Sequence, residues 1–169
     1  MRNVRLGLLA LTVIALLPGA QAKSADWDAM QFLVGEWVGE GGGGPGQGSG
    51  GFSFLPDLKN TVLVRRNHSE YPPQDGRPAY SHEDLMVIYR DGTRVRGDNY
   101  DNEGHVIRYA VQAAGGQVVF LGDEQPSAAR YRLIYTKSGA YAVKIMFEIT
   151  PPGKSDQFAK YIEASAKRK

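Results

Sequence analysis

The sequence predicts an all-β protein, an antiparallel up-and-down β-barrel of about ten strands preceded by one short helix. Short runs rich in Val, Ile, Tyr, Phe and Thr follow one another from residue 36 onward. Turn dipeptides such as Asp91-Gly92 and Gly115-Gly116 separate these runs, as is typical of antiparallel hairpins. No helical pattern lies between the runs to cross over between parallel strands, so we expect hairpin connections throughout.

The composition is that of one folded domain. Of the 169 residues, 42% are hydrophobic and 22% are charged, which excludes a disordered chain. The 20 Lys and Arg exceed the 18 Asp and Glu only through Arg2 and Arg5. Without a clear excess of bases, we expect no nucleic-acid partner. These residues include no cysteine, which excludes disulfides, thiolate nucleophiles and cysteine-ligated zinc.

Residues 1–22 have the pattern of a secretory signal peptide. Two arginines form a basic start, an apolar stretch covers 6–17, and Ala20-Gln21-Ala22 is a cleavage site of the A-x-A type. The apolar stretch of about 12 residues is shorter than the roughly 20 that a membrane-spanning helix needs. We therefore expect export to the periplasm or the cell exterior, with a single barrel domain over 23–169 and no transmembrane segment in the mature chain.

The expected elements can be placed along the chain. A helix is expected over 25–34, where Asp26 can cap it and apolar residues share one side. Alternation is clearest over 141–150, where the odd-numbered residues are all apolar or aromatic. A closed barrel hides every strand edge, so we favour it over the alternative, a β-sandwich. The strands are expected over 36–41, 51–55, 61–69, 80–89, 93–100, 105–113, 118–121, 130–136, 141–150 and 157–164.

The segment Gly35-Glu36-Trp37 resembles the G-x-W motif at the start of lipocalin-like calycin barrels. Its continuation through Gly39 and Gly41 is similar to the opening of nitrobindins and other small fatty-acid-binding-protein-like barrels. The stretches 82–89 and 100–107 look like parts of exported bacterial proteins of this calycin-like group. The resemblance implies a ten-stranded barrel that carries a small molecule, with the ring of Trp37 closing one end.

Haem is the cofactor that this resemblance raises as an alternative. Haem-binding nitrobindins place an axial histidine on a late strand, whereas His68, His82 and His105 all lie within the first six expected strands. The family's haem ligand is therefore not carried over, although Tyr141 or Tyr161 can in principle coordinate ferric haem. We expect no cofactor, and we keep a haem-binding protein as an alternative.

Other motifs do not predict chemistry. The glycine-rich segment 41–51 matches G-x-G-x-x-G by composition alone, and a strand follows it where a dinucleotide site needs a helix. We expect this segment to be a loop that closes over the barrel mouth. His82 and Asp84 share a strand face and are possible metal ligands. His68 would be the third ligand only if the strands expected over 61–69 and 80–89 pair suitably. With no nucleophile elbow either, we expect neither a metal nor catalysis.

The interior of the barrel is the expected site of function. His105 alternates with Ile107 and Tyr109, so it should face the dry side, either as a core histidine or as a polar contact for a ligand. We expect a cavity bounded by Trp37, Tyr109, Val143 and Ile145. The candidate ligand-binding residues are Trp37, Arg66, His82, Tyr100, His105 and Tyr109.

The predicted function is that of a carrier or sensor for a small apolar or amphipathic molecule. Burial of apolar surface would drive binding, at about 25 cal/mol per Å² before the costs of ordering are subtracted. A packed barrel that binds a partner and holds no ligand is a further alternative.

Overall fold

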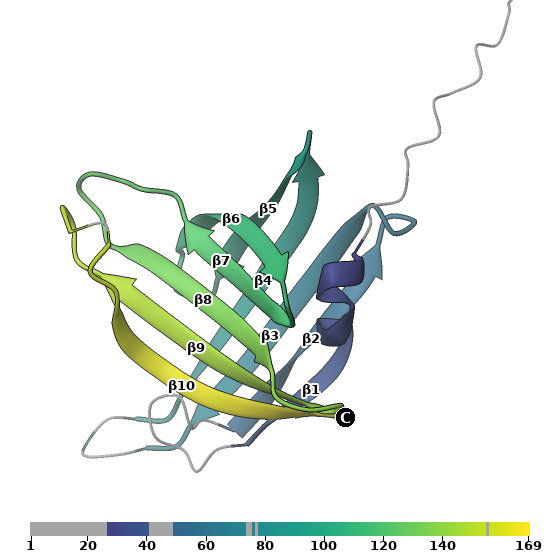
Figure 1. Ribbon diagram of the computed structural model, residues 1–169. Helices are drawn as coiled ribbons and strands as arrows, with labels where there is room; N and C mark the ends of the chain where they lie inside the picture. The colour runs from purple at the N-terminus through teal and green to yellow at the C-terminus, as the bar shows by residue number, and fades with distance from the viewer. Residues whose placement is uncertain (1–26, 41–48, 74–75, 77, 155) are drawn as a thin grey trace, which may run out of the picture.

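The computed structural model describes residues 27–40, 49–73, 76, 78–154 and 156–169. Ten antiparallel strands form a closed barrel, which confirms the predicted fold and excludes the β-sandwich (Figure 1). The signal peptide and most of the glycine-rich segment, residues 41–48, lie outside the described residues. Removal of the signal peptide, export and closure of this loop over the barrel therefore stay predictions.

The strand boundaries agree with the expected ones to within a few residues. Gly50 and Gly51, expected partly in the glycine-rich loop, belong to the second strand. The elements are η1 (Asp28–Leu33), β1 (Gly35–Glu40), β2 (Ser49–Asp57), β3 (Val62–Tyr71), β4 (Tyr80–Asp91), β5 (Arg94–Asp101), β6 (Val106–Ala114), β7 (Gln117–Gly122), β8 (Arg130–Lys137), β9 (Ala142–Thr150) and β10 (Ala159–Arg168).

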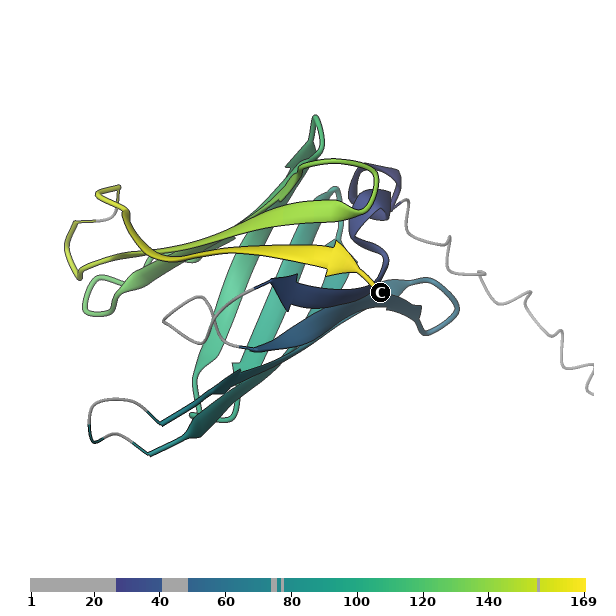
Figure 2. The ribbon, with the colours of Figure 1, turned by 90° about the horizontal axis from the view of Figure 1, so that it is seen from below.

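The strands follow one another round the barrel in chain order. Each strand pairs with the next along the chain, and β1 pairs with β10 to close the ring. At this seam Trp37 lies opposite Arg168, and the Lys169 amide donates to the Glu36 carbonyl at 2.9 Å. Figure 2 shows β10 and β1 running side by side.

The predicted helix is a single 3-10 segment, Asp28–Leu33, that lies against one end of the barrel (Figure 1). Its N-cap is Trp27, which makes no side-chain cap bond. The expected cap, Asp26, lies outside the described residues. The helix ends because Val34 is extended and Gly35 has a φ of +130°, a conformation that favours glycine. Trp27, Met30 and Leu33 are buried against the barrel.

Arg168 ties the helix to the last strand. Its guanidinium donates to the carbonyls of Val34 at 2.6 Å and Phe32 at 3.0 Å, and it lies 4.7 Å from the centre of the Trp37 ring. The Trp37 indole donates to the Leu33 carbonyl at 2.8 Å. These contacts close the helix end of the barrel.

The interior is packed at the helix end. Fully buried apolar side chains from almost every strand meet there, around the ring of Tyr135. Phe54 contacts this ring edge-on with centroids 5.3 Å apart, and Phe120 does so at 6.2 Å. Toward the opposite end, the inward-facing residues of β3, β4 and β5 become polar, and this is where the interior is hollow.

Candidate functional site

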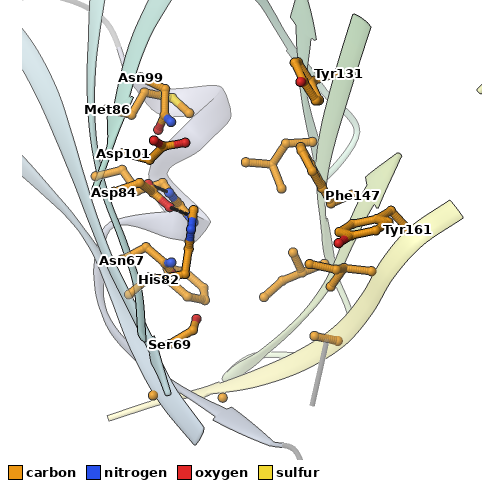
Figure 3. A pocket seen from close by; sticks show the side chains of 18 of the residues that line it. Asn67, Ser69, His82, Asp84, Met86, Asn99, Asp101, Tyr131, Phe147 and Tyr161 are labelled. Carbon is orange, nitrogen blue, oxygen red and sulfur yellow. Dashed lines mark hydrogen bonds and ion pairs between the residues drawn. The ribbon is translucent and has the colours of Figure 1, made fainter. Parts of the chain in front are cut away.

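The hollow half of the barrel contains a cavity of about 380 Å³. This volume lies at the lower end of the range for small-molecule sites. The lining residues come from strand ends opposite η1, and several of them are exposed to solvent, so the cavity is open at that end. Figure 3 shows polar side chains on one wall facing aromatic side chains across the space.

The apolar wall is formed by β8, β9 and β10. Tyr131 and Phe147 stack with ring centroids 5.8 Å apart, and Tyr161 meets Phe147 edge-on at 6.3 Å. Ile145 and Ile149 complete this wall on β9, as the alternation over 141–150 predicted. The pairing of β10 with β9 shifts register between Lys160 and Ile162. Because of this bulge, Tyr161 and Ile162 both line the cavity although they are consecutive.

The polar wall is formed by β3, β4 and β5. Alternate residues face inward, which brings Asn67 and Ser69 of β3 together with His82 and Asp84 of β4. The same alternation places Asn99 and Asp101 of β5 on this wall. The labelled side chains of all three strands lie along one side of the cavity (Figure 3).

An ion-pair network runs along the polar wall. The buried guanidinium of Arg65 pairs with Asp84 and donates from Nε to the Tyr135 hydroxyl at 2.8 Å. His82 Nε2 lies 3.4 Å from the Asp84 carboxylate, and His82 Nδ1 lies 3.2 Å from the Glu103 carboxylate. The hydrogen bond to Asp84, followed by that to Glu103, raises the pKa of His82 to about 9. Imidazolium is therefore the main form of His82 at neutral pH.

The charges of the network also determine the protonation state of Asp84. Burial alone would raise the pKa of this carboxyl, but the Arg65 guanidinium and the His82 ring outweigh burial and hold the pKa below its usual value. Asp84 is therefore ionised at neutral pH. The network brings together alternating positive and negative groups from β3, β4 and the β5–β6 turn.

The β5–β6 turn carries the outer part of the polar wall. Asp101 Oδ1 accepts the backbone N–H groups of Glu103 at 3.0 Å and His105 at 2.8 Å. His105 Nδ1 lies 2.9 Å from Asp101 Oδ2 and 3.8 Å from the Glu103 carboxylate. Burial would raise the pKa of Asp101, but its bonds to the His105 and Glu103 backbone and to the His105 ring lower it.

Asn99 is the polar side chain at the inner end of the wall. It is 7% exposed and lines the cavity, and its Oδ1 atom has no hydrogen-bond partner among the described residues. Buried acceptors are normally paired, so this unpaired oxygen is a candidate contact for a ligand donor.

Of the six predicted ligand-binding residues, three line the cavity and three do not. His82, His105 and Tyr109 line the cavity. Trp37 lies in the packed end, as does Val143, one of the expected cavity boundaries. Arg66 and Tyr100 face the outside, where they line a shallow depression. That any of the six binds a ligand stays a prediction, and we leave Arg66, Tyr100 and Trp37 out of the candidate site because they do not reach the cavity.

The expected position of His105 needs a correction. It does line the same cavity as Ile107 and Tyr109, but its side chain is 57% exposed instead of lying in a dry core. The reason is that β6 begins at Val106, so His105 belongs to the turn at the open end.

Sequence reasoning missed Arg65, Asn99 and Glu103 as site residues. Arg65 follows Val62, Leu63 and Val64, which are apolar on both faces of the strand, so the sequence does not show which of Arg65 and Arg66 points inward. His82 and Asp84 alternate on β4, and β4 pairs antiparallel with β3. Combining the alternation with this pairing would have extended the polar wall to β3.

Neither a metal nor haem is favoured by the histidines. Among the described ranges, no group of three or more His, Cys, Asp or Glu residues is placed to hold a metal ion. His68 faces outward and pairs with Glu70 and Glu83, away from His82. Both ring nitrogens of His82 face carboxylates, and a protonated imidazole does not coordinate iron. Of the two tyrosines considered for haem, Tyr161 lines the cavity, whereas Tyr141 is 71% exposed and does not.

Comparison with known proteins adds no family assignment. No family model matches the chain, and no curated protein matches it. No helix in the described part of the chain is both long and apolar enough to cross a membrane. The fold and the site define the class of protein: a closed ten-stranded antiparallel β-barrel with a cavity at one end, an architecture consistent with a calycin-like barrel.

Proposed function

We propose that the protein is an exported carrier or sensor that binds one small amphipathic molecule inside its barrel. The observation that carries this proposal is the cavity of about 380 Å³ with two unlike walls. The apolar part of a ligand would lie against Phe147, Ile145 and Ile149, where removal of its surface from water drives binding. The polar part would face the wall formed by β3, β4 and β5 and fix the ligand's orientation.

Binding is favoured over the two other functions considered. A packed barrel that acts only through its outer surface would not need a cavity, so the hollow half argues against it. Haem binding is less favoured because His82 is occupied by two carboxylates, which leaves Tyr161 as the candidate axial ligand in the cavity. Catalysis is not proposed because the charged groups of the cavity wall are paired with one another.

Filling the cavity tests this function. Ile145→Trp places a large ring into the space, and Lys144→Trp places the same ring on the outer face of the same strand. The probe is the neutral fluorophore N-phenyl-1-naphthylamine, titrated into the full chain. We expect binding by the wild type, at least tenfold weaker binding by Ile145→Trp and less than a twofold change in Lys144→Trp.

Two results would contradict the proposal. One is a wild-type chain, folded by circular dichroism, that does not bind the probe. The other is equal binding by the two tryptophan variants, which would place the probe outside the cavity. Native mass spectrometry of the gently purified chain, followed by denaturing extraction, would then identify any molecule that the protein retains.

A further inference from the structure

We propose that the ligand of the cavity carries an ammonium head group on an apolar body, and that the polar wall selects against a carboxylate head group. This inference rests on the proposed function and deepens it. Four features of the cavity support it: basic groups that are already paired, carboxylates with spare acceptor capacity, a buried acceptor without a partner, and aromatic rings on the facing wall.

The basic side chains of the wall are already paired. Arg65, His82 and His105 are the basic side chains among the described residues that line the cavity. Arg65 is buried against Asp84 and the Tyr135 hydroxyl, and His82 lies between Asp84 and Glu103. His105 Nδ1 faces Asp101 and Glu103. A ligand carboxylate would have to approach groups that internal carboxylates already contact, which opposes binding of an anion.

The carboxylates of the wall retain capacity for another donor. Asp84 pairs with Arg65 and His82. Glu103 pairs with His82 and His105, and Asp101 pairs with His105. A carboxylate has about four acceptor sites. Glu103 uses part of its capacity on His82 and His105, and its side chain is 54% exposed at the open end of the cavity. An ammonium group can reach it there without displacing the network.

Asn99 adds an independent requirement for a donor. Its Oδ1 atom is buried without a partner on the same face of β5 as Asp101. A ligand N–H group that reaches this atom would satisfy it, whereas a carboxylate oxygen would place a second acceptor against it.

The aromatic wall favours the same charge. Tyr131, Phe147 and Tyr161 lie across the cavity from the polar wall (Figure 3). Tyr71 and Tyr80, stacked with centroids 4.6 Å apart, line the cavity near its open end. Ring faces attract cations and do not attract carboxylates. The rings partly cover one another's faces, so this wall favours an ammonium group where a face is left open to the cavity.

Three ligands with the same apolar chain test the proposal. Decylammonium, 1-decanol and decanoate are titrated into the full chain at pH 7.4 by calorimetry and by displacement of N-phenyl-1-naphthylamine. We expect decylammonium to bind at least tenfold more tightly than decanoate, with decanol between them. Equal or tighter binding of decanoate would overturn the head-group assignment and leave the proposed function standing. If the folded chain binds neither the fluorophore nor any decyl ligand, both proposals fail.

Two variants test whether the polar wall causes the preference for ammonium over carboxylate. Glu103→Gln removes the exposed carboxylate, and Asn99→Leu removes the unpaired acceptor. We expect Glu103→Gln, at the open end where the ammonium group is reached, to lower the ratio of decylammonium to decanoate affinity at least fivefold, and Asn99→Leu, at the inner end, to lower it less. The matched control is Glu83→Gln, which removes an exposed carboxylate that pairs with His68 on the outer face. A ratio that stays at the wild-type value in Glu103→Gln would overturn the proposal, whether or not Asn99→Leu folds.

Discussion

Arg65 is held inside the barrel by groups from two other strands. The side chains of Arg65 and Asp84 are 8% and 7% exposed, and Tyr135 accepts a further bond from the guanidinium at 2.8 Å. Removing a charge of this kind from water is costly, and its partner must compensate for that cost. The buried pair therefore makes each of its members depend on the other.

This dependence predicts a large effect of Asp84→Asn. The substitution leaves the Arg65 charge buried without its counterion, and we expect the free energy of unfolding to fall by about 3–5 kcal/mol. Denaturant unfolding measures the change. The control is Asp123→Asn, which breaks the partly exposed Arg96–Asp123 pair and should cost no more than about 1 kcal/mol. A loss for Asp84→Asn as small as that of the control would contradict the role of Asp84 as the counterion.

His82 predicts a pH dependence of stability. Its pKa is raised from 6.5 to about 9 in the folded protein, first by Asp84 and then by Glu103. A raised pKa contributes stability that is fully present below pH 6.5 and is lost as the pH rises through 9. The difference in unfolding free energy between the wild type and His82→Gln should therefore be largest at pH 6 and smaller at pH 9.5. Denaturant unfolding at these two values checks this, and a difference independent of pH would contradict it.

At the residue scale, alternation predicted part of the site. It correctly placed His82 and Asp84 on one face of β4, and Ile145 and Phe147 on one face of β9. Both faces line the cavity. It did not decide between Arg65 and Arg66, because the residues before them are apolar on both faces. The assignment of Tyr100 to the interior was one residue away from the inward-facing Asn99 and Asp101. A shift of one residue moves a side chain to the opposite face, so small uncertainties in register become large errors in the site.

At the element scale, local turn and strand signals were sufficient for the hairpins and insufficient for the ends of the chain. The strand expected over 157–164 extends to Arg168, because its last residues pair with β1. In the sequence these residues look like a solvated basic tail, and the partner that makes them a strand lies at the other end of the chain. The 3-10 helix depends on the same kind of long-range contact, because Arg168 binds the Val34 and Phe32 carbonyls.

The contact between Arg168 and the helix predicts a specific loss of stability. Arg168→Ala removes the bonds to the Val34 and Phe32 carbonyls and the contact with the Trp37 ring. We expect the free energy of unfolding to fall by about 2 kcal/mol, because a hydrogen bond from a charged donor contributes more to stability than one between two neutral groups. Lys167→Ala is the control, because Lys167 is exposed and pairs only at the surface with Glu40. Equal losses in the two variants, measured by denaturant unfolding, would contradict the role of Arg168.

At the scale of the whole molecule, the two halves of the interior have different compositions. The half near η1 holds the fully buried aromatic and aliphatic side chains, which supply most of the apolar burial. The other half keeps an open volume, with charged groups paired in a network and the Asn99 Oδ1 atom left without a partner. Of the four predicted cavity boundaries, Tyr109 and Ile145 line the cavity, whereas Trp37 and Val143 lie in the packed half. The location could not be predicted fully because it depends on which inward residues are large enough to meet across the barrel.

The seam between β1 and β10 has a consequence for how the chain folds. Nine of the ten ladders join strands that are consecutive in the chain and can form as successive hairpins. The tenth joins Gly35–Glu40 to Ala159–Arg168, which are far apart in the sequence. Until this ladder forms, the sheet has two free edges, and the helix lacks the guanidinium that holds it in place. A partly folded chain is therefore exposed to edge-to-edge association until the seam closes.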